Sequence, residues 1–515
     1  MDNIIGPTEQ RHFTEQRRRS VVIDYLLAAS THGLRGVGRA YSTCNRTFWV
    51  IVFTLATGLM FYFVIQSILQ YYAYPTQTKV EINLDLAMDF PAVTVCSATP
   101  NRYDKTNISL VNLFYRLYPS YAKFNQTILN SLLVPLYIDL FNRNQIEEEQ
   151  SIGYKLTDIM LYCNYSGIDC SNAFVPSLSS IFGNCYTFNW KTSIPFFTLN
   201  SVSNTFVIKE GLPLGFYIPR ESYFPTLSYD AGLVVLLHDN DELPLPNENG
   251  CGLQPGLSHS IIYRKTITTF LPAPYSQCTS DIADDLRSLY DTTFMNQTAS
   301  QTVAYSESLC RELCEQAYVF SQCSCILPSA FFTRHIYTLD GHLISANICN
   351  PFNQQIQCAL DSEQKFVASE ELQTLWCTRC APQCQHTDFS TDLSAQSAPS
   401  EAEIENWAAI LLNGTNTTSL LVPDDFAQRF DYYFERNYLK VFIGCGSKYV
   451  TEYKQEAKLS FIDTFSAIGG QTGLWIGLSV LSVIELIELL YRLIHKLLIH
   501  RKNTVTPMTI VVNSK

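Results

Sequence analysis

Charged residues are scarce in this sequence: they make up 16% of its 515 residues, whereas hydrophobic residues make up 47%. So few charges exclude an ordinary soluble domain for the whole chain, because some apolar part must be kept apart from water. The chain also lacks the GxSxG, HExxH, P-loop and dinucleotide-binding motifs, which argues against an enzyme. We therefore expect no catalytic residues, no cofactor, no metal and no nucleic acid partner.

Only two stretches are long and apolar enough to cross a membrane. The first, Phe48–Tyr72, has no charged residue over 25 positions, and Arg46 precedes it. The second lies within 461–491, where no charge occurs from Thr464 to Ile484. The first 20 residues lack the apolar core of a cleaved signal peptide. The sequence predicts a membrane protein with two transmembrane helices.

The second stretch has an unusual face. Gly469, Gly473 and Gly477 recur every four residues, and the same spacing leads through Leu481 to Glu485. Glu488 extends this face as well. Small residues alone indicate close helix packing, but carboxylates within a span are tolerated where they face water or a partner. We therefore predict one continuous helix that turns this face toward an aqueous path for cations.

The segment between the spans has the marks of a cell exterior. Sixteen of the 17 cysteines lie between Cys96 and Cys445, and six Asn-x-Ser/Thr sequons lie in the same segment. Paired cysteines and sequons together indicate the secretory lumen or the extracellular space, and they favour disulfides over a zinc site at Cys377–Cys380. The predicted glycosylation sites are Asn107, Asn125, Asn164, Asn296, Asn413 and Asn416; a further sequon at Asn45 falls outside the segment.

Charge follows the same division. Residues 1–47 carry a net charge of +3, residues 492–515 carry +5, and residues 48–460 carry −17. Basic ends fit the positive-inside rule with both termini in the cytoplasm. The predicted parts are a cytoplasmic N-terminus (1–47), a first span (48–72), an extracellular domain (73–460), a pore-lining second span (461–491) and a cytoplasmic C-terminus (492–515).

The extracellular domain mixes strand and helix patterns, so we expect an α+β fold rich in disulfides. Strand-like runs occur at 80–84, 90–96, 182–275 and 426–449, and helical apolar spacing occurs at 110–118, 128–141, 281–290 and 306–322. Residues 387–425 are polar and are predicted to form a surface loop and a helix. Asp284 and Asp285 are predicted to lie on a solvated helix face.

Several motifs together resemble the degenerin/epithelial sodium channel family. They are His32-Gly33 before the first span, FPAVTVC at 90–96, GNCYTFN at 183–189, the cysteine set 310–325 and GGQTGLWIGLSVLSVIELIE at 469–488. The resemblance implies a homotrimer, or a heterotrimer with related subunits, in the plasma membrane. It also implies an extracellular domain made of palm, β-ball, finger, thumb and knuckle.

The resemblance also implies roles for single residues. The selectivity filter falls on Gly477, Leu478 and Ser479. Amiloride, the family's blocker, would bind at Gly473, and Ser466 occupies the degenerin position that influences gating. The lower pore would include His32 and Gly33 of a re-entrant segment, together with Glu485 and Glu488. The disulfides that it implies are Cys96–Cys185, Cys163–Cys170, Cys278–Cys384, Cys310–Cys380, Cys314–Cys377, Cys323–Cys358 and Cys325–Cys349, with Cys251 and Cys445 left to pair with each other.

The stimulus that opens such a channel is harder to read. The extracellular segment has only five histidines, which makes a dedicated proton sensor less favoured. In character the sequence is closest to the invertebrate FMRFamide-gated sodium channels, so we expect an amidated neuropeptide as ligand. The residues of the chain that bind this ligand stay unassigned, although the aromatic region 111–141 and the acidic loop His238–Glu242 are candidates. The alternatives are an acid-gated, bile-acid-gated or constitutively active sodium channel, or a non-conducting two-span receptor or adhesion subunit.

Overall fold

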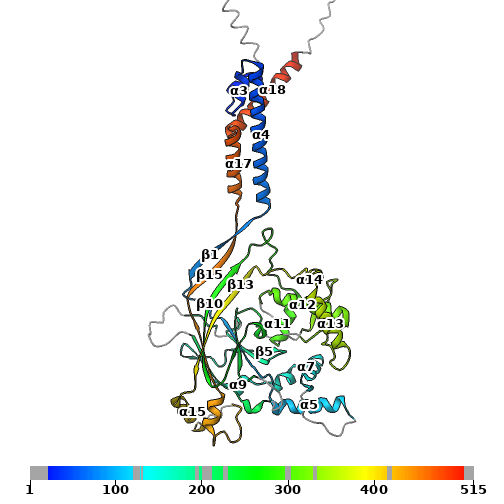
Figure 1. The fold of residues 1–515 in the computed structure, drawn as a ribbon, viewed down its shortest axis with the longest axis vertical. Helices are drawn as coiled ribbons and strands as arrows, with labels where there is room; N and C mark the ends of the chain where they lie inside the picture. Colours follow the sequence, from blue (N-terminus) through cyan, green and yellow to red (C-terminus); the bar gives the residue numbers. More distant parts are fainter. Residues whose placement is uncertain are drawn as a thin grey trace, which may run out of the picture. The chain divides into compact units, whose positions relative to one another are not determined.

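The computed structural model describes residues 21–119, 128, 131–191, 196–199, 211–223, 230–295, 303–328, 333–413 and 420–503. The chain divides into two units (Figure 1). The helical unit comprises Met1–Gln77 and Glu456–Lys515, and the disulfide unit comprises Thr78–Gln455. This division falls near the predicted boundaries at 73 and 460.

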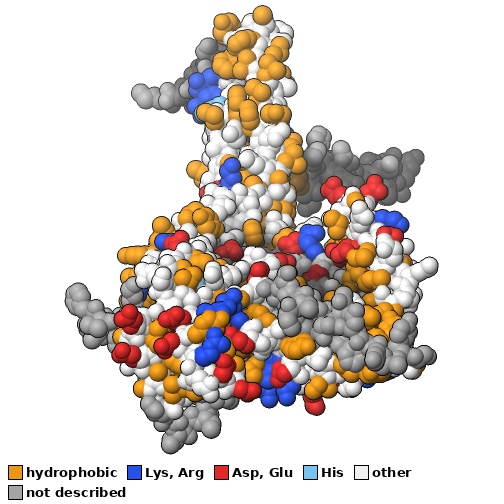
Figure 2. Space-filling model, turned by 60° about the horizontal axis from the view of Figure 1, so that its bottom comes forward, with side chains coloured by type: hydrophobic (Ala, Val, Ile, Leu, Met, Phe, Trp, Pro, Cys, Tyr) orange, Lys and Arg blue, Asp and Glu red, His pale blue; other side chains and the backbone are white. Residues whose placement is uncertain are grey.

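Helix α4, Thr43–Tyr72, forms the first span, and its 30 residues are enough to cross a membrane. It begins before the predicted Phe48 because Ser42 caps it: the Ser42 hydroxyl accepts a hydrogen bond from the Asn45 amide at 3.2 Å. Figure 2 shows hydrophobic side chains over much of the visible surface of the helical unit. Very few of the apolar side chains of α4 are buried within the chain, so lipid or further subunits must cover them.

The second span is broken, and the prediction of one continuous helix was wrong. Helix α17, Phe461–Ile476, and helix α18, Val480–Asn503, are bent by 68° at residues 477–479. Gly477 ends α17 in the left-handed conformation, with φ of +67°, which suits a glycine at this position. Among the described residues there is therefore one helix that is long and apolar enough to span a membrane, or two spans if the bent pair counts as one.

Two short helices precede the first span. They are α2, Val21–Ala28, and α3, Leu34–Arg39, and the Ser30–Gly33 turn separates them. Gly33 has φ of +86°, so this turn also needs a residue that accepts the left-handed region.

A large sheet forms one side of the disulfide unit. The 13-residue strand β10, Leu257–Thr269, is central to it: it pairs antiparallel with β13, Gln385–Ser397, and parallel with β14 and then β15. Apart from β13, the strand order along the sheet is β1 (Thr76–Leu84), β15 (Tyr449–Ala457), β10, β14 (Tyr438–Cys445), β7 (Gly211–Tyr217), β3 (Met160–Tyr165) and β4 (Ile168–Asp169).

A second sheet packs its apolar side chains into the same core as the first. Its central strand β2 is buried along its whole length, as its β-branched sequence predicts. The strand order is β5 (Phe174–Ser179), β6 (Gly183–Phe188), β2 (Ala92–Ser97), β8 (Leu233–His238) and β9 (Cys251–Leu253). The small remaining sheet is the hairpin β11–β12, His335–Tyr337 and Leu343–Ser345.

Helices form the rest of the disulfide unit. One group, α5, α7 and α8, contributes to a core of its own (Tyr103–Leu117, Leu133–Asn142 and Ile146–Ile152). A second group comprises α11 (Asp284–Thr293), α12 (Glu307–Cys323), α13 (Gln355–Ala368) and α14 (Glu370–Trp376). Disulfides tie α12 to α13 and to the segment just after α14. The others are α9 (Leu156–Ile159), α10 (Pro246–Asn249), α15 (Glu401–Asn413) and α16 (Phe430–Asn437).

Two predictions for the end of this unit were wrong. Part of the expected loop at 387–425 is strand β13, because pairing with β10 along 13 residues outweighs its polar sequence. The expected strand at 426–449 begins as helix α16, whose buried Phe430, Tyr433 and Phe434 recur at helical spacing. The part of the predicted strand region at 205–210 lies outside the described residues.

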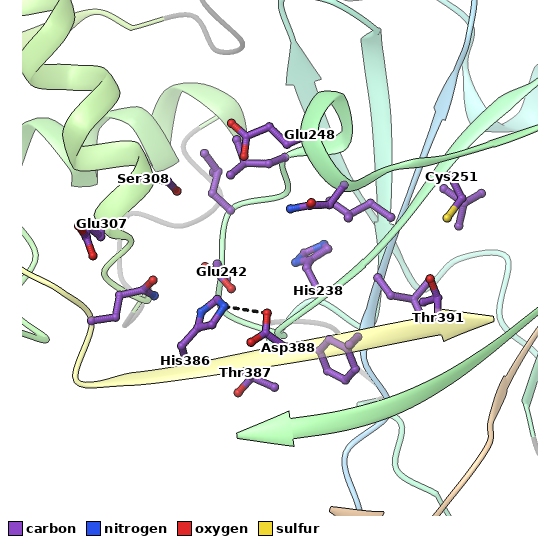
Figure 3. Close-up of a pocket in the computed structure, with 18 of the residues that line it drawn as sticks. His238, Glu242, Glu248, Cys251, Glu307, Ser308, His386, Thr387, Asp388 and Thr391 are labelled. Atoms are coloured by element: carbon purple, nitrogen blue, oxygen red, sulfur yellow. Dashed lines mark hydrogen bonds and ion pairs between the residues drawn. The ribbon is translucent and has the colours of Figure 1, made fainter. Parts of the chain in front are cut away.

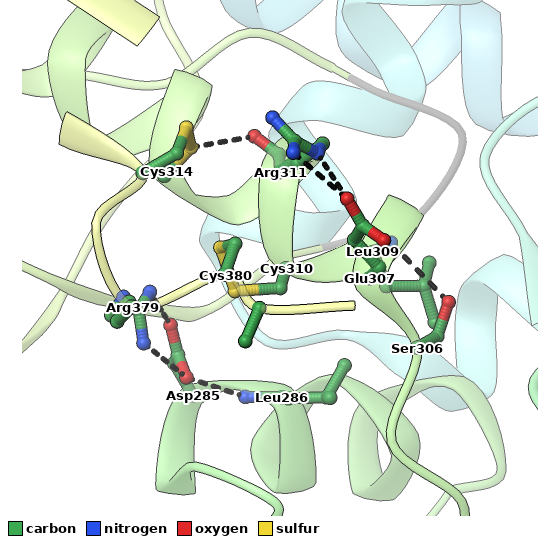
Figure 4. Close-up of a disulfide and its surroundings, with 12 residues drawn as sticks. Asp285, Leu286, Ser306, Glu307, Leu309, Cys310, Arg311, Cys314, Arg379 and Cys380 are labelled. Carbon is green, nitrogen blue, oxygen red and sulfur yellow. Dashed lines mark hydrogen bonds and ion pairs between the residues drawn. A yellow bond between two sulfur atoms is a disulfide. The ribbon is translucent and has the colours of Figure 1, made fainter. Parts of the chain in front are cut away.

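Asp285 also differs from its prediction. It is 1% exposed rather than solvated, and both of its carboxylate oxygens accept hydrogen bonds from the Arg379 guanidinium (Figure 4). Arg379 follows Cys377, and the disulfides Cys314–Cys377 and Cys310–Cys380 tie this segment to α12. A buried carboxylate needs such a partner, because an unpaired buried charge is strongly destabilising.

We therefore expect Arg379→Met to lower the free energy of unfolding by about 3–5 kcal/mol, since it leaves Asp285 buried and unpaired. The matched control is Arg264→Met, which breaks an exposed ion pair with Asp392 at 2.8 Å and is expected to cost less than about 1 kcal/mol. The measurement is denaturant unfolding of the purified full-length protein. Equal losses for the two variants would contradict a special role for the buried pair.

Candidate functional site

The break in the second span contains the three residues that the resemblance assigns to the filter. Gly477, Leu478 and Ser479 lie between α17 and α18, where the Gly477 amide donates to the Gly473 carbonyl at 3.0 Å and the Leu478 amide donates to the Thr472 carbonyl at 3.1 Å. Ser479 starts the next helix, because its hydroxyl accepts a hydrogen bond from the Ser482 amide at 3.3 Å. Carbonyl groups at a helix end lack intrahelical partners, and carbonyl and hydroxyl oxygens can replace part of the hydration shell of a cation.

The turn between α2 and α3 is bonded to this break. The His32 amide donates to the Ile476 carbonyl at 2.7 Å. A Cβ placed on Gly477 would lie 2.7 Å from the His32 ring, so a larger residue at 477 would displace the histidine. The structure thus brings the His32-Gly33 turn to the break at residues 477–479, more than 440 positions away in the sequence.

Serine side chains extend this contact to Glu485, and sequence reasoning missed them. The Ser30 amide and hydroxyl both donate to one carboxylate oxygen of Glu485, each at 3.0 Å. The Ser30 hydroxyl also lies 2.6 Å from the Ser482 hydroxyl. The sequence showed Ser30 only as part of a small polar turn, since a hydroxyl carries no periodic signal.

The two glutamates of α18 have different surroundings. Glu488 forms an ion pair with Arg492 at 2.6 Å, one helical turn away. Glu485 has no ion pair with any basic side chain in the described part of the chain. Because of the bend after Ile476, the predicted face does not run straight from the glycines to these carboxylates.

The glycine face of α17 is open. A Cβ on Gly469, Gly470 or Gly473 would meet no atom within 4 Å. Ser466, which the resemblance assigns to the degenerin position, is also exposed. This face therefore has room for another helix or a small blocker in the single chain.

Seven disulfides join the same pairs that the resemblance implies. They are Cys96–Cys185, Cys163–Cys170, Cys278–Cys384, Cys310–Cys380, Cys314–Cys377, Cys323–Cys358 and Cys325–Cys349. The expected bond between Cys251 and Cys445 was wrong, because no disulfide joins these two cysteines in the described structure. The two lie in different sheets: Cys251 on β9 lies opposite Val235 on β8, and Cys445 on β14 lies opposite Tyr263 on β10.

The sequons differ in their surroundings. Asn164 is exposed at the end of β3, whereas Asn107 is half-buried within α5. Asn45 lies in the first turn of α4. Asn125, Asn296 and Asn416, and the side chain of Asn413, fall outside the described residues.

An acidic cavity of about 620 Å³ lies in the disulfide unit (Figure 3). Its lining includes four carboxylates, of which Glu307 pairs with Arg311 at 2.8 Å and Asp388 lies 2.9 Å from His386. The other two are Glu242 and Glu248. None of the described residues of 111–141 lines this cavity, so the two sequence candidates for a receptor site, 111–141 and His238–Glu242, do not meet there.

Burial gives the cavity a group that titrates near neutral pH. It raises the pKa of Glu242 to about 7, and nearby His386 partly opposes this shift. Elsewhere burial raises the pKa of Glu149 to about 8, and burial with Glu363 and Glu312 raises the pKa of Glu315 to about 7. The sequence could not reveal these carboxyls, since their burial follows from the fold.

His238 lines the same cavity but stays neutral at physiological pH. Burial lowers its pKa to about 4. The ring lies 2.8 Å from the Asp239 carbonyl through Nδ1 and 2.8 Å from the Thr94 hydroxyl through Nε2. A carbonyl can only accept, so Nδ1 carries the proton and Thr94 donates to Nε2. His238 therefore fixes the start of the acidic loop and does not sense protons.

The comparisons with known proteins match nearly the whole chain. The family model described as amiloride-sensitive sodium channel matches residues 25–489. The chain is 25% identical to acid-sensing ion channel 1C of Danio rerio over 93% of this chain and 85% of the relative. It is 25% identical to acid-sensing ion channel 2 of Mus musculus over 92% and 86%. It is 24% identical to the epithelial sodium channel subunit alpha of Neoceratodus forsteri over 90% and 78%.

We expect Glu485→Gln to lower single-channel conductance about twofold or more, since it removes a negative charge that no basic side chain of the described residues compensates. Glu488→Gln is the comparison, because Arg492 already compensates its charge. Its effect is expected to be smaller. Single-channel recording measures both, and an unchanged conductance in Glu485→Gln would remove this residue from the conduction path.

Proposed function

Because this chain belongs to the amiloride-sensitive sodium channel family, we propose that three copies of it form a sodium-selective channel in the plasma membrane, blocked by amiloride and opened by an extracellular ligand. The observation that supports this most directly is the broken second span. Residues 477–479 leave the helix where the Ser30–Gly33 turn is bonded to it. A break of this kind is tolerated within a membrane only where protein or water surrounds it.

In the proposed pore, three copies of Gly477, Leu478 and Ser479 surround one axis and offer carbonyl and hydroxyl oxygens to a sodium ion. Three copies of Glu485 then raise the local cation concentration on the side of α18. Amiloride, a cation, would bind at the open face near Gly473. Both termini are placed in the cytoplasm, in keeping with the basic ends of the chain.

The acidic cavity is the proposed place for the ligand. Four carboxylates face only one arginine there, so a cationic ligand is favoured. The first candidate is an amidated neuropeptide of FMRFamide type, whose arginine would pair with a carboxylate of the cavity. Phe389 supplies an aromatic surface in the same lining. Binding between α12, β8 and β13 would change how these elements pack, which is a direct route to gating.

A second candidate stimulus is the proton. The similar channels of Danio rerio and Mus musculus are named acid-sensing. Glu242 and Glu315 have pKa values raised to about 7, so a modest fall in pH would neutralise them. The scarcity of exposed histidines does not exclude this stimulus, because these carboxyls supply the titration that histidines otherwise provide.

Expression of the chain alone in oocytes tests the proposal. We expect an inward sodium current that amiloride blocks and that amidated peptides evoke when applied at constant pH. Steps from pH 8 to pH 6 without peptide test the second stimulus. A current from neither treatment, with the protein shown at the surface, would contradict a self-sufficient ligand-gated channel; a current that is insensitive to sodium replacement would contradict sodium conduction.

Glu242→Gln separates the two stimuli. Its carboxyl is protonated below pH 7 and ionised above it, so glutamine imitates the acidic state at every pH. If protons open the channel, we expect a flatter response between pH 8 and pH 6. If a cationic peptide opens it, we expect a rise of about tenfold in the half-activating concentration, since a partly buried charge partner is lost.

The control for this variant is Glu248→Gln, which neutralises an exposed carboxylate of the same cavity. We expect a smaller change in either response, because solvent screens an exposed charge. Identical changes in both variants would show that only the net charge of the cavity matters.

A further inference from the structure

Three serine hydroxyls lie in a row at the break in the second span. The Ser30 hydroxyl lies 2.6 Å from the Ser482 hydroxyl, which in turn lies 3.2 Å from the Ser479 hydroxyl. At the other end of the row, the Ser30 hydroxyl lies 3.0 Å from a carboxylate oxygen of Glu485. The row therefore connects the last residue of the predicted filter to a carboxylate six positions further along the chain.

The direction of these hydrogen bonds follows from the number of protons available. A hydroxyl has one proton and two lone pairs, whereas a carboxylate oxygen only accepts. The proton of Ser30 is therefore committed to Glu485. The contact between Ser30 and Ser482 then needs the proton of Ser482, and the contact between Ser482 and Ser479 needs the proton of Ser479. All three hydroxyl protons thus point along the row toward Glu485.

Backbone contacts and burial support this direction. The Ser479 amide donates to the Ser482 oxygen at 3.2 Å, and the Ser482 amide donates to the Ser479 oxygen at 3.3 Å. Ser482 is 1% exposed, so water does not offer its proton another acceptor. The Ser479 oxygen accepts one of these bonds, which leaves one of its two lone pairs without a donor among the described residues.

The direction of the row decides what Ser479 presents to an ion. A hydroxyl oxygen attracts a cation, whereas a hydroxyl proton repels it. While its proton points to Ser482, Ser479 offers oxygen alone. If the row were cut, the Ser479 hydroxyl would be free to rotate its proton toward the ion. Glu485 would still be held by the Ser30 amide at 3.0 Å, so the loss of a serine hydroxyl leaves the carboxylate in place.

We propose that Ser30 and Ser482 are positioning residues for sodium selectivity, because they join Ser479 to Glu485 in a hydrogen-bond relay that keeps the oxygen of Ser479 turned toward the ion. The proposal rests on the proposed function, which places Ser479 beside a sodium ion. Sodium, the smaller ion, approaches an oxygen more closely than potassium does. It therefore loses more attraction than potassium when a proton is presented in place of the oxygen.

The first test measures the sodium-to-potassium permeability ratio from reversal potentials in oocytes. We expect Ser30→Ala and Ser482→Ala each to lower this ratio about three- to tenfold, since each removes a hydrogen bond of the relay. Ser30→Thr keeps the hydroxyl and is expected to retain the wild-type ratio. So is the control Thr57→Ala, which removes a hydroxyl that donates to the Phe53 carbonyl of its own helix at 2.7 Å.

The double variant S30A/S482A distinguishes a relay from two independent effects. Both substitutions cut the same row, so we expect the double variant to lower the ratio no further than the larger of the two single effects. An unchanged ratio in both single variants would overturn the proposal. So would single effects that multiply in the double variant, or a loss in Ser30→Thr equal to the loss in Ser30→Ala.

A second test needs no current. Hydrogen exchange of the purified full-length protein is compared in sodium chloride and in potassium chloride at equal concentration. We expect sodium to slow exchange in peptides covering 477–485 in the wild type and in Ser30→Thr, and to slow it at least about threefold less in Ser30→Ala. No sodium-specific slowing in the wild type, or equal slowing in all three proteins, would contradict the relay. Ser30 is exposed in the single chain, so Ser30→Ala decides the matter if Ser482→Ala does not fold.

These outcomes separate the relay from the proposed function. A wild-type protein that carries no current but shows sodium-specific slowing that depends on the Ser30 hydroxyl would retain the relay and lose the proposed channel. A wild-type channel that conducts sodium, with a permeability ratio that Ser30→Ala and Ser482→Ala leave unchanged, would retain the proposed function and lose the relay.

Discussion

A helix that breaks inside an apolar segment leaves backbone groups without partners, and the helical unit depends on how these groups are satisfied. The Ile476 carbonyl is satisfied by the His32 amide, and the beginning of α18 is satisfied by Ser479 and Ser482. Ser30 then joins Ser482 and Glu485 to the same turn. One small segment before the first span thereby stabilises a bend of 68° in the second.

The sequence predicted the family, the two-span fold class and the disulfide-rich α+β domain, and the family model and the seven disulfides confirm these three. It predicted them because cysteines, sequons and uncharged runs are visible without a fold. It failed at the bend, since Gly477 continues a regular four-residue glycine spacing and only its backbone conformation shows that the helix ends there.

Other failures share a different cause, namely pairing across long sequence distances. Strand β13 is polar, so its sequence predicts a loop, but it pairs with β10, which lies more than 100 residues earlier in the chain. Asp285 looked solvated because its partner Arg379 is 94 residues away. The raised pKa values of Glu242 and Glu149 likewise come from burial that no local sequence pattern predicts. For these residues the physical cause lies in tertiary contacts, which the sequence alone does not specify.

Strand β10 has a mechanical consequence. It is bonded to β13 over its full length on one side, and on the other side to β14 near its start and to β15 near its end. A strand of 13 residues spans roughly 40 Å and resists stretching because each ladder bond shares the load. A pull along β10 at the end that pairs with β14 would therefore be transmitted to the end that pairs with β15. Since β15 ends at Ala457 and α17 begins at Phe461, the strand that receives this force is followed along the chain by the second span.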